Sequence, residues 1–149
     1  MPITGSCRCN AVTYQLRVDA LPDSYVCHCL DCQTWSGSAF AEHALLPEEL
    51  IALEGETTTY ARDSNGFVSE QIICKICHTR IYNRNSAVPG MIVLRAGTLT
   101  ASDRLAPMAH IWVKRKQDWV VIPAGIPAWP ESPTPTEFGE ALRHARGKR

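Results

Sequence analysis

The chain has 149 residues, of which 45% are hydrophobic and 20% are charged. These are the values of one globular domain with its own core, and they exclude wholesale disorder. The 15 basic residues equal the 15 acidic ones, which argues against a general nucleic-acid binder, because such proteins carry a basic excess. No apolar run approaches the roughly 20 residues that span a bilayer, and the N-terminus lacks the pattern of a signal peptide, so we expect a cytoplasmic protein without membrane contact.

Most of the chain is typical of short β-strands separated by turns. Residues 11–18 alternate apolar and polar side chains, which predicts a strand with one buried face. Residues 57–61 are expected to pair with a strand that begins at Phe67, because Asn65-Gly66 between them is a favoured hairpin turn. A single helical turn is predicted at residues 47–50. Segments rich in β-branched, aromatic or aliphatic side chains predict further strands over residues 67–73, 91–94, 109–113 and 119–122.

The C-terminal part of the chain has a different character. Prolines recur from Pro123 to Pro135 and exclude both a helix and a central strand, so this segment is expected to be extended. A short helix should then begin after Thr134, because Thr134 and Glu137 have the spacing of a capping box and Pro135 suits the first helical position. Its apolar stripe is predicted to pack on the body of the protein, with a contact in a homodimer as the alternative; the stripe comprises Phe138, Ala141, Leu142 and Ala145.

The seven cysteines form three tight clusters. Their odd number and short spacings do not suit a disulfide framework, whereas thiolates in C-x-C and C-x-x-C arrangements can share one metal ion in a reducing compartment. Zinc is the usual metal in such sulfur-only sites. The clusters are Cys7 with Cys9, then Cys27 with Cys29 and Cys32, then Cys74 with Cys77.

The first and last clusters together predict a closed four-cysteine zinc site. Cys7 and Cys9 would point to the same face of a strand, and Cys74 and Cys77 would form a knuckle, a tight turn that presents two sulfurs to one point. Such a site would join two segments far apart in the chain, so metal binding would stabilise the fold. His78 follows the knuckle at a position that often requires a positive φ, which histidine tolerates better than most residues.

The middle cluster predicts an open site, because no fourth cysteine remains for it. Catalytic zinc sites keep one position for a water molecule or a substrate. Three thiolates give the site a negative net charge, so an incoming thiol is a more natural fourth ligand than hydroxide. His28 lies between two of the cysteines, and we expect it to pack or hydrogen-bond. The alternative is that another side chain closes the site, and the candidates are His28, His43, His78, His110 and Asp31.

The cysteine motifs belong to a longer pattern that runs from Gly5 to Val120. It includes Gly5-Ser6-Cys7-Arg8-Cys9, Cys27-His28-Cys29-Leu30-Asp31-Cys32, Ser36-Gly37, Cys74-Lys75-Ile76-Cys77, Ala96-Gly97-Thr98-Leu99 and His110-Ile111-Trp112-Val113. In this pattern the chain resembles the glutathione-dependent formaldehyde-activating enzyme family. The resemblance implies a mainly β fold, the β-tent of centromere protein V-like proteins, built from short antiparallel sheets and hairpins stapled by zinc. It implies a structural zinc at Cys7, Cys9, Cys74 and Cys77 and a second, catalytic zinc at Cys27, Cys29 and Cys32.

The same resemblance implies a function in formaldehyde detoxification. The expected enzyme is a zinc-dependent carbon–sulfur lyase of the S-(hydroxymethyl)glutathione synthase type, which condenses glutathione or a similar thiol with formaldehyde or a similar carbonyl compound. The alternative is a non-enzymatic zinc-binding module that binds a protein partner or a small thiol. The predicted organisation is a zinc-binding β-tent domain at residues 1–122, followed by a proline-rich extension with a short helix at residues 123–149, packed on the same domain.

Overall fold

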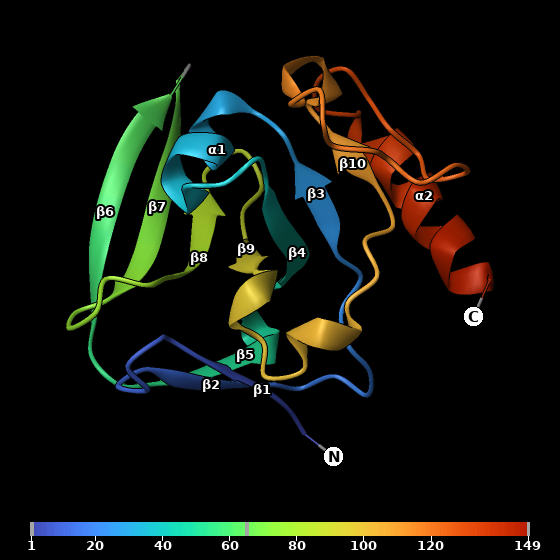
Figure 1. The fold of residues 1–149 in the computed structure, drawn as a ribbon. Helices are drawn as coiled ribbons and strands as arrows, with labels where there is room; N and C mark the ends of the chain where they lie inside the picture. Colours follow the sequence, from blue (N-terminus) through green and yellow to red (C-terminus); the bar gives the residue numbers. More distant parts are fainter. Residues whose placement is uncertain (1, 65, 149) are drawn as a thin grey trace. The chain divides into compact units, whose positions relative to one another are not determined.

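The computed structural model describes residues 2–64 and 66–148 (Figure 1). The chain folds into two compact units, each built from two separate segments. The first unit comprises Met1–Pro22 and Ala44–Leu105, and the second unit comprises Asp23–His43 and Ala106–Arg149. The first and last cysteine clusters therefore belong to the first unit, and the middle cluster belongs to the second.

A three-stranded antiparallel sheet opens the first unit. It consists of β1 (Ile3–Ser6), β2 (Thr13–Leu16) and β5 (Ile51–Glu54), in the order β1-β2-β5 (Figure 1). Tyr14 and Leu16 are buried while their neighbours on β2 are exposed, which confirms the predicted alternation. Gly5 lies opposite Tyr14, and a Cβ there would come within 2.2 Å of the tyrosine ring. Glycine at this position therefore leaves room for Tyr14, whose hydroxyl hydrogen-bonds Thr98 Oγ1 at 2.7 Å.

Four antiparallel strands of a second, seven-stranded sheet also belong to the first unit. The strands β6 (Thr57–Ser64), β7 (Phe67–Cys74), β8 (Arg80–Asn85) and β9 (Met91–Arg95) pair in chain order (Figure 1). The register of β6 against β7 confirms the predicted hairpin, although Asn65 of its turn lies outside the described residues. Three 3-10 helices connect the strands: η1 (Glu48–Leu50), which confirms the predicted helical turn, η2 (Ala96–Thr98) and η3 (Ser102–Arg104).

The core of the first unit draws side chains from both of its sheets. Removing these side chains from water supplies the main stabilisation of the unit. Two of the cluster cysteines, Cys7 and Cys74, are buried within this core, whereas Cys77 is half-buried and Cys9 is exposed, so the four-cysteine cluster lies at the edge of the core. The largest fully buried aliphatic side chains of the core are Val12, Ile81, Ile92 and Leu94.

The second unit is built around β3 (Tyr25–Cys27). This strand pairs antiparallel with residues 41–43 of β4 (Ala41–Pro47) and parallel with β10 (His110–Ile111). The strand order of the seven-stranded sheet is β10-β3-β4-β9-β8-β7-β6. Between β3 and β4 the chain forms α1 (Leu30–Ser36), a short helix that ends at Gly37 with a φ of 68°. The cysteines of the middle cluster therefore lie where a strand passes directly into a helix.

Two of the predicted strands differ in the structure. The segment 109–113 contributes only the two residues of β10, because Trp112 has a φ of 59° and η4 (Val113–Arg115) follows. The prediction of a strand over residues 119–122 was wrong. The Val120 N–H donates to the Gln117 carbonyl at 3.1 Å, and the Val120 carbonyl accepts from Lys116 Nζ at 2.8 Å. The backbone groups that would pair with a neighbouring strand are therefore already hydrogen-bonded within this segment.

The C-terminal helix α2 (Pro135–Gly147) confirms its sequence prediction. The Thr134 hydroxyl accepts from the Glu137 N–H, and the Glu137 carboxylate accepts from the Thr134 N–H, which completes the capping box. Phe138 of the apolar stripe packs its ring edge-on against Tyr25, with 5.2 Å between ring centroids. The proline-rich segment before α2 is neither helix nor regular strand, as expected, but it is only partly extended: it turns at residues 124–125, where Gly125 has a φ of 82°, and makes one isolated bridge from Ala128 to His110. The fold is thus mainly β with a C-terminal helix, as expected, and no helix among the described residues could span a membrane.

Candidate metal centres

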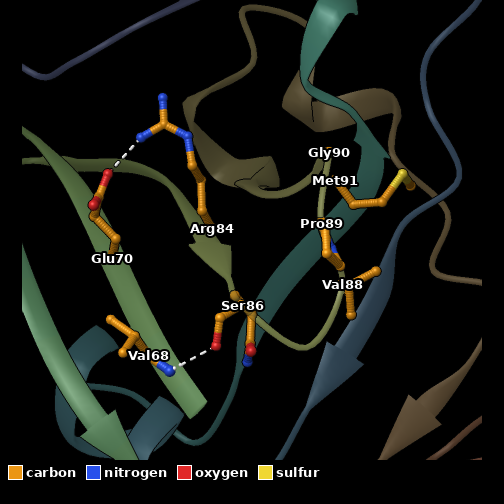
Figure 2. A pocket seen from close by; sticks show the side chains of 9 residues that line it. Val68, Glu70, Arg84, Ser86, Val88, Pro89, Gly90 and Met91 are labelled. Atoms are coloured by element: carbon orange, nitrogen blue, oxygen red, sulfur yellow. Dashed lines mark hydrogen bonds and ion pairs between the residues drawn. The ribbon is translucent and has the colours of Figure 1, made fainter.

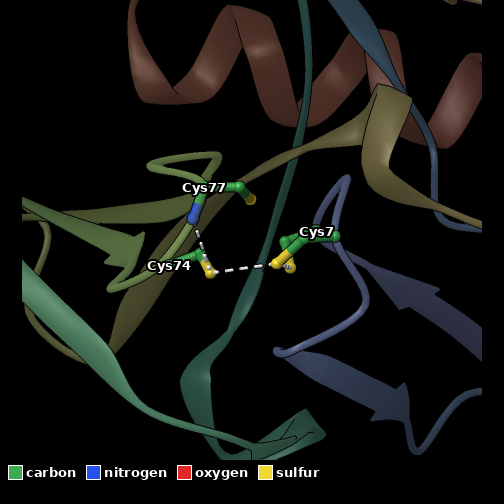
Figure 3. Close-up of side chains that lie close together, drawn as sticks. Cys7, Cys74 and Cys77 are labelled. Carbon is green, nitrogen blue, oxygen red and sulfur yellow. Dashed lines mark hydrogen bonds between the residues drawn. The ribbon is translucent and has the colours of Figure 1, made fainter.

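Four sulfur atoms converge in the first unit. Figure 3 labels three of the cysteines that carry them, Cys7, Cys74 and Cys77. Cys7 and Cys9 come from the turn after β1, Cys74 is the last residue of β7, and Cys77 lies in the turn between β7 and β8. The four Sγ atoms all lie within 4.8 Å of one another, and the distances are 3.6 Å from Cys7 to Cys9 and 3.9 Å from Cys9 to Cys74. A tetrahedron with zinc–sulfur bonds of 2.3 Å has sulfur–sulfur edges of about 3.8 Å. The donor set and its spacing therefore fit a zinc ion.

The local backbone orients these sulfurs. The Ile76 and Cys77 N–H groups donate to Cys74 Sγ at 3.4 and 3.5 Å, and the Val12 N–H donates to Cys7 Sγ at 3.3 Å. His78 has a φ of 62°, which confirms the expected left-handed residue after the knuckle. Cys7 and Cys9 are not on a strand, contrary to the prediction. The chain leaves β1 at Ser6 and turns through Asn10, whose φ is 64°, so a second turn presents this pair of sulfurs.

Three sulfur atoms converge in the second unit. Cys27 ends β3, Cys29 is the N-cap of α1, and Cys32 lies in the first turn of that helix. The Cys32 N–H donates to Cys29 Sγ at 3.4 Å, and the three Sγ atoms lie within 4.8 Å of one another. Among the described residues, no ligand atom of a histidine, aspartate or glutamate joins this group. The arrangement therefore favours an open site over one that is closed by a histidine or an acid.

Crowding of the thiols shifts their pKa values. Hydrogen bonds from Cys27 and Cys32 lower the pKa of Cys29 to about 2, and the interaction with Cys29 and Cys32 raises the pKa of Cys27. In the first unit, the Thr79 hydroxyl and N–H lower the pKa of Cys77 to about 5. The pKa of Cys7 is also lowered despite burial, by the hydrogen bond from the Val12 N–H and by its neighbouring thiols, so two thiolates are favoured in the four-cysteine cluster and one in the three-cysteine cluster. A bound cation would favour the thiolate form of the other sulfurs as well.

Buried histidines surround the three-cysteine cluster. His28 is fully buried, and its Nε2 lies 2.9 Å from Nδ1 of His110, which confirms the expected hydrogen-bonding role. Burial and the nearby His110 and Lys116 lower the pKa of His28 to about 4, so this pair is neutral at physiological pH. His43 is also buried, and its Nε2 lies 3.5 Å from Cys32 Sγ. None of these histidines is part of the sulfur group itself, and His43 contacts one of its sulfurs.

Gln33 connects α1 to the segment that follows η4. Its Nε2 donates to the carbonyls of His28 and Arg115, both at 2.9 Å, and its Oε1 accepts from Gln117 Nε2 at 3.3 Å. Gln117 in turn accepts from Trp119 Nε1 at 2.6 Å. Sequence reasoning missed this network and α1 itself. The sequence signal that could have identified α1 is the glycine after Ser36, because Gly37 adopts the left-handed conformation of a helix C-cap.

A pocket of about 360 Å³ lies elsewhere, on the first unit (Figure 2). It is formed by β7, β8 and the start of β9, and it contains no cysteine or histidine. Its one cationic side chain, Arg84, forms ion pairs with Glu70 and Glu48. Because these charges are already paired, the pocket offers no reactive group, and the cysteine clusters remain the candidate functional sites.

A family model described as glutathione-dependent formaldehyde-activating enzyme matches residues 2–115, a span that includes all seven cysteines. The chain belongs to this family. A crystal structure of a Rhodobacter sphaeroides protein, a structural genomics target, is similar to it with a TM-score of 0.52. The similarity covers 65% of this chain and 87% of that protein at 17% sequence identity, so it supports the fold alone. No curated protein shows significant sequence similarity to the chain. The family match ends before α2.

Proposed function

We propose that this family member is a zinc-dependent carbon–sulfur lyase-type enzyme that acts in the synthetic direction, with Cys27, Cys29 and Cys32 as its reaction centre. The observation that carries the proposal is a group of three sulfurs that no other ligand atom of the described residues joins. The family description, which names glutathione and formaldehyde, supports the substrate class: a thiol and a small carbonyl compound.

The four-cysteine cluster has a structural role in this proposal. Cys7, Cys9, Cys74 and Cys77 supply the four sulfurs of a closed tetrahedral site, so no position remains for a substrate. Cys7 and Cys74 are buried in the core of the first unit. Metal binding there would hold two distant segments together and would stabilise the fold.

The reaction needs no oxidant or reductant. A C–S bond forms between the thiol sulfur and the carbonyl carbon, the π bond of the carbonyl breaks, and the thiol proton is transferred to the carbonyl oxygen. Zinc, when bound, lowers the pKa of a thiol and so favours the nucleophilic thiolate. Cys27, Cys29 and Cys32 provide three of the four donors that zinc prefers. The junction of β3 and α1 fixes the positions of these three donors.

NMR exchange between free and glutathione-bound formaldehyde tests this proposal. The zinc-loaded protein should accelerate the exchange, and Cys29→Ala should abolish the acceleration. Thr34→Ala is the matched control, because Thr34 is exposed on the same helix and should keep the wild-type rate. A wild-type rate equal to the uncatalysed background, or a Cys29→Ala rate equal to the wild-type rate, would exclude this function.

The metal content gives a separate test. Elemental analysis of gently purified protein should find close to two zinc ions per chain. One ion, retained in Cys29→Ala but lost in Cys74→Ser, would mean that only the four-cysteine cluster holds metal. The three-cysteine cluster would then not be a zinc-dependent reaction centre.

A non-enzymatic binding module is the second candidate. Helix α1, which carries Cys32, has no buried residue and leaves Leu30 and Trp35 55% and 44% exposed. Exposed apolar side chains beside a reactive cluster are typical of a surface that a partner or ligand covers. Binding of glutathione to the zinc-loaded protein, without any acceleration of formaldehyde exchange, would favour this candidate over the enzyme.

A further inference from the structure

A continuous series of side-chain contacts leads from the C-terminal helix to the three-cysteine cluster. Phe138 of α2 packs its ring edge-on against Tyr25 of β3, at 5.2 Å between centroids. Tyr25 stacks on His43 of β4, at 5.4 Å and an interplanar angle of 19°. His43 Nε2 lies 3.5 Å from Cys32 Sγ, within hydrogen-bond distance for sulfur. All four residues belong to the second unit.

The fold fixes the middle of this series. Tyr25 and His43 are directly opposite partners in the antiparallel pairing of β3 with β4, so the sheet register brings their rings together. Both side chains are buried, which leaves the His43 ring little freedom to rotate. Stacking on one face of the ring therefore determines the direction in which Nε2 points, and that direction is toward Cys32.

A hydrogen bond to a ligand sulfur affects metal binding. An N–H donor fixes the orientation of the thiolate and withdraws part of its negative charge, and such outer contacts usually change metal affinity by about 10- to 100-fold. His43 Nε2 lies within hydrogen-bond distance of Cys32 Sγ, and the tautomer with its proton on Nε2 donates to that sulfur; His43 is not itself a member of the sulfur group.

We propose that α2, through Phe138, Tyr25 and His43, holds Cys32 in position for a metal ion, so that the segment beyond the family match is a functional part of the three-cysteine site. His43 is a positioning residue in this proposal, and Phe138 acts through it. The inference rests on the proposed function only in requiring that Cys27, Cys29 and Cys32 bind a metal ion.

Metal affinity and the cobalt spectrum test this inference on the full-length protein. Zinc is titrated against a chelator to give the affinity of each cluster, and Cys29→Ala identifies the step that belongs to the three-cysteine site. Cobalt(II) replaces zinc in parallel, because its thiolate charge-transfer and ligand-field bands report the geometry of the site. The variants are Phe138→Ala, His43→Leu and His43→Gln, where glutamine keeps a side-chain N–H donor. Leu142→Ala is the matched control, a half-buried apolar residue of the same stripe on α2.

Phe138→Ala and His43→Leu should each weaken the three-cysteine site about tenfold and shift its cobalt bands, while the four-cysteine site is unchanged. His43→Gln should restore most of the affinity. Leu142→Ala should lower the melting temperature without changing either affinity. Wild-type affinity and spectrum in Phe138→Ala or His43→Leu would overturn the inference, as would a Leu142→Ala variant that loses as much affinity as Phe138→Ala.

The metal measurements also separate this inference from the proposed function. A protein that binds two metal ions and shows the variant effects, but does not accelerate formaldehyde exchange, would lack the proposed activity while the positioning role stands. A wild-type protein that binds only one metal ion, in the four-cysteine cluster, would overturn the positioning role directly.

Discussion

Cys74→Ser should destabilise the protein far more than Cys29→Ser. Cys74 is fully buried in the core of the first unit, and its Sγ lies 3.9 Å from Cys9 Sγ, a residue 65 positions away in the chain. Cys29 is only half-buried, and its sulfur partners lie within the same short segment. The two substitutions are chemically identical, so the difference between them reports the role of each cluster.

The length of the closed loop gives the expected magnitude. Treated as a cross-link, the four-cysteine site removes chain entropy from the unfolded state equivalent to about 4 kcal/mol, whereas the same relation gives about 2 kcal/mol for the short loop from Cys27 to Cys32. A domain of this size loses roughly 2–4 °C in melting temperature per kcal/mol. Cys74→Ser should therefore melt about 8–16 °C below the wild type, and Cys29→Ser should lose about half of that or less.

Thermal unfolding followed by circular dichroism measures both shifts at equal zinc and protein concentrations. Elemental analysis of the same samples shows which variant has lost which ion. A wild-type sample treated with a metal chelator gives the loss in melting temperature when both clusters lack metal. Equal melting losses in the two variants, or a larger loss in Cys29→Ser, would refute the division into a structural and an open site.

Three further predictions follow from the fold. Gly5→Ala should lower the free energy of unfolding, measured with denaturant, by about 1–3 kcal/mol, because the added Cβ would come within 2.2 Å of the Tyr14 ring. An unchanged free energy of unfolding would mean that β1 and β2 move apart without cost. Thr134→Ala removes the N-cap of α2 and should cost about 1 kcal/mol by the same assay, and a neutral effect would show that the cap contributes nothing. Hydrogen bonds from Thr134 lower the pKa of Glu137, so the stability that this carboxylate contributes is present above its usual value of 4.5 and is lost as the pH falls below it. Thr134→Ala should flatten that part of the stability–pH curve, and a curve parallel to the wild type would contradict the assignment.

Short sequence patterns predicted the parts of the fold that depend on interactions between residues close together in the chain. The alternation around Tyr14 and the capping box at Thr134 were confirmed, because a strand face and a helix cap are set by residues two or three positions apart. The convergence of Cys7 and Cys9 was also predicted, although for the wrong reason: a turn, not a strand, brings the two sulfurs together. Two cysteines separated by one residue can bring their sulfurs together either on a strand or in a turn.

The elements and contacts that the sequence did not predict depend on pairing between residues that are far apart in the chain. Strand β3 has only three residues, and α1 has seven with none buried, so neither has the periodic apolar face that identifies an element. The contact of Tyr25 with His43 exists because β3 and β4 pair in one particular register, which no local pattern specifies. Residues 119–122 have strand-like composition, but Trp119 and Val121 are 69% and 84% exposed, since no strand of the described residues pairs with this segment.

The division of the chain into discontinuous units has a consequence for biosynthesis. The first unit can close once residue 105 has left the ribosome, and all four sulfurs of its cluster are available by then. The second unit begins earlier in the chain, at Asp23, but it needs β10 and α2 near the C-terminus. Domains generally fold as their residues emerge during synthesis. Cys27, Cys29 and Cys32 therefore remain without their finished scaffold until α2 has been synthesised, and the four-cysteine cluster should be ready to bind metal before the three-cysteine cluster.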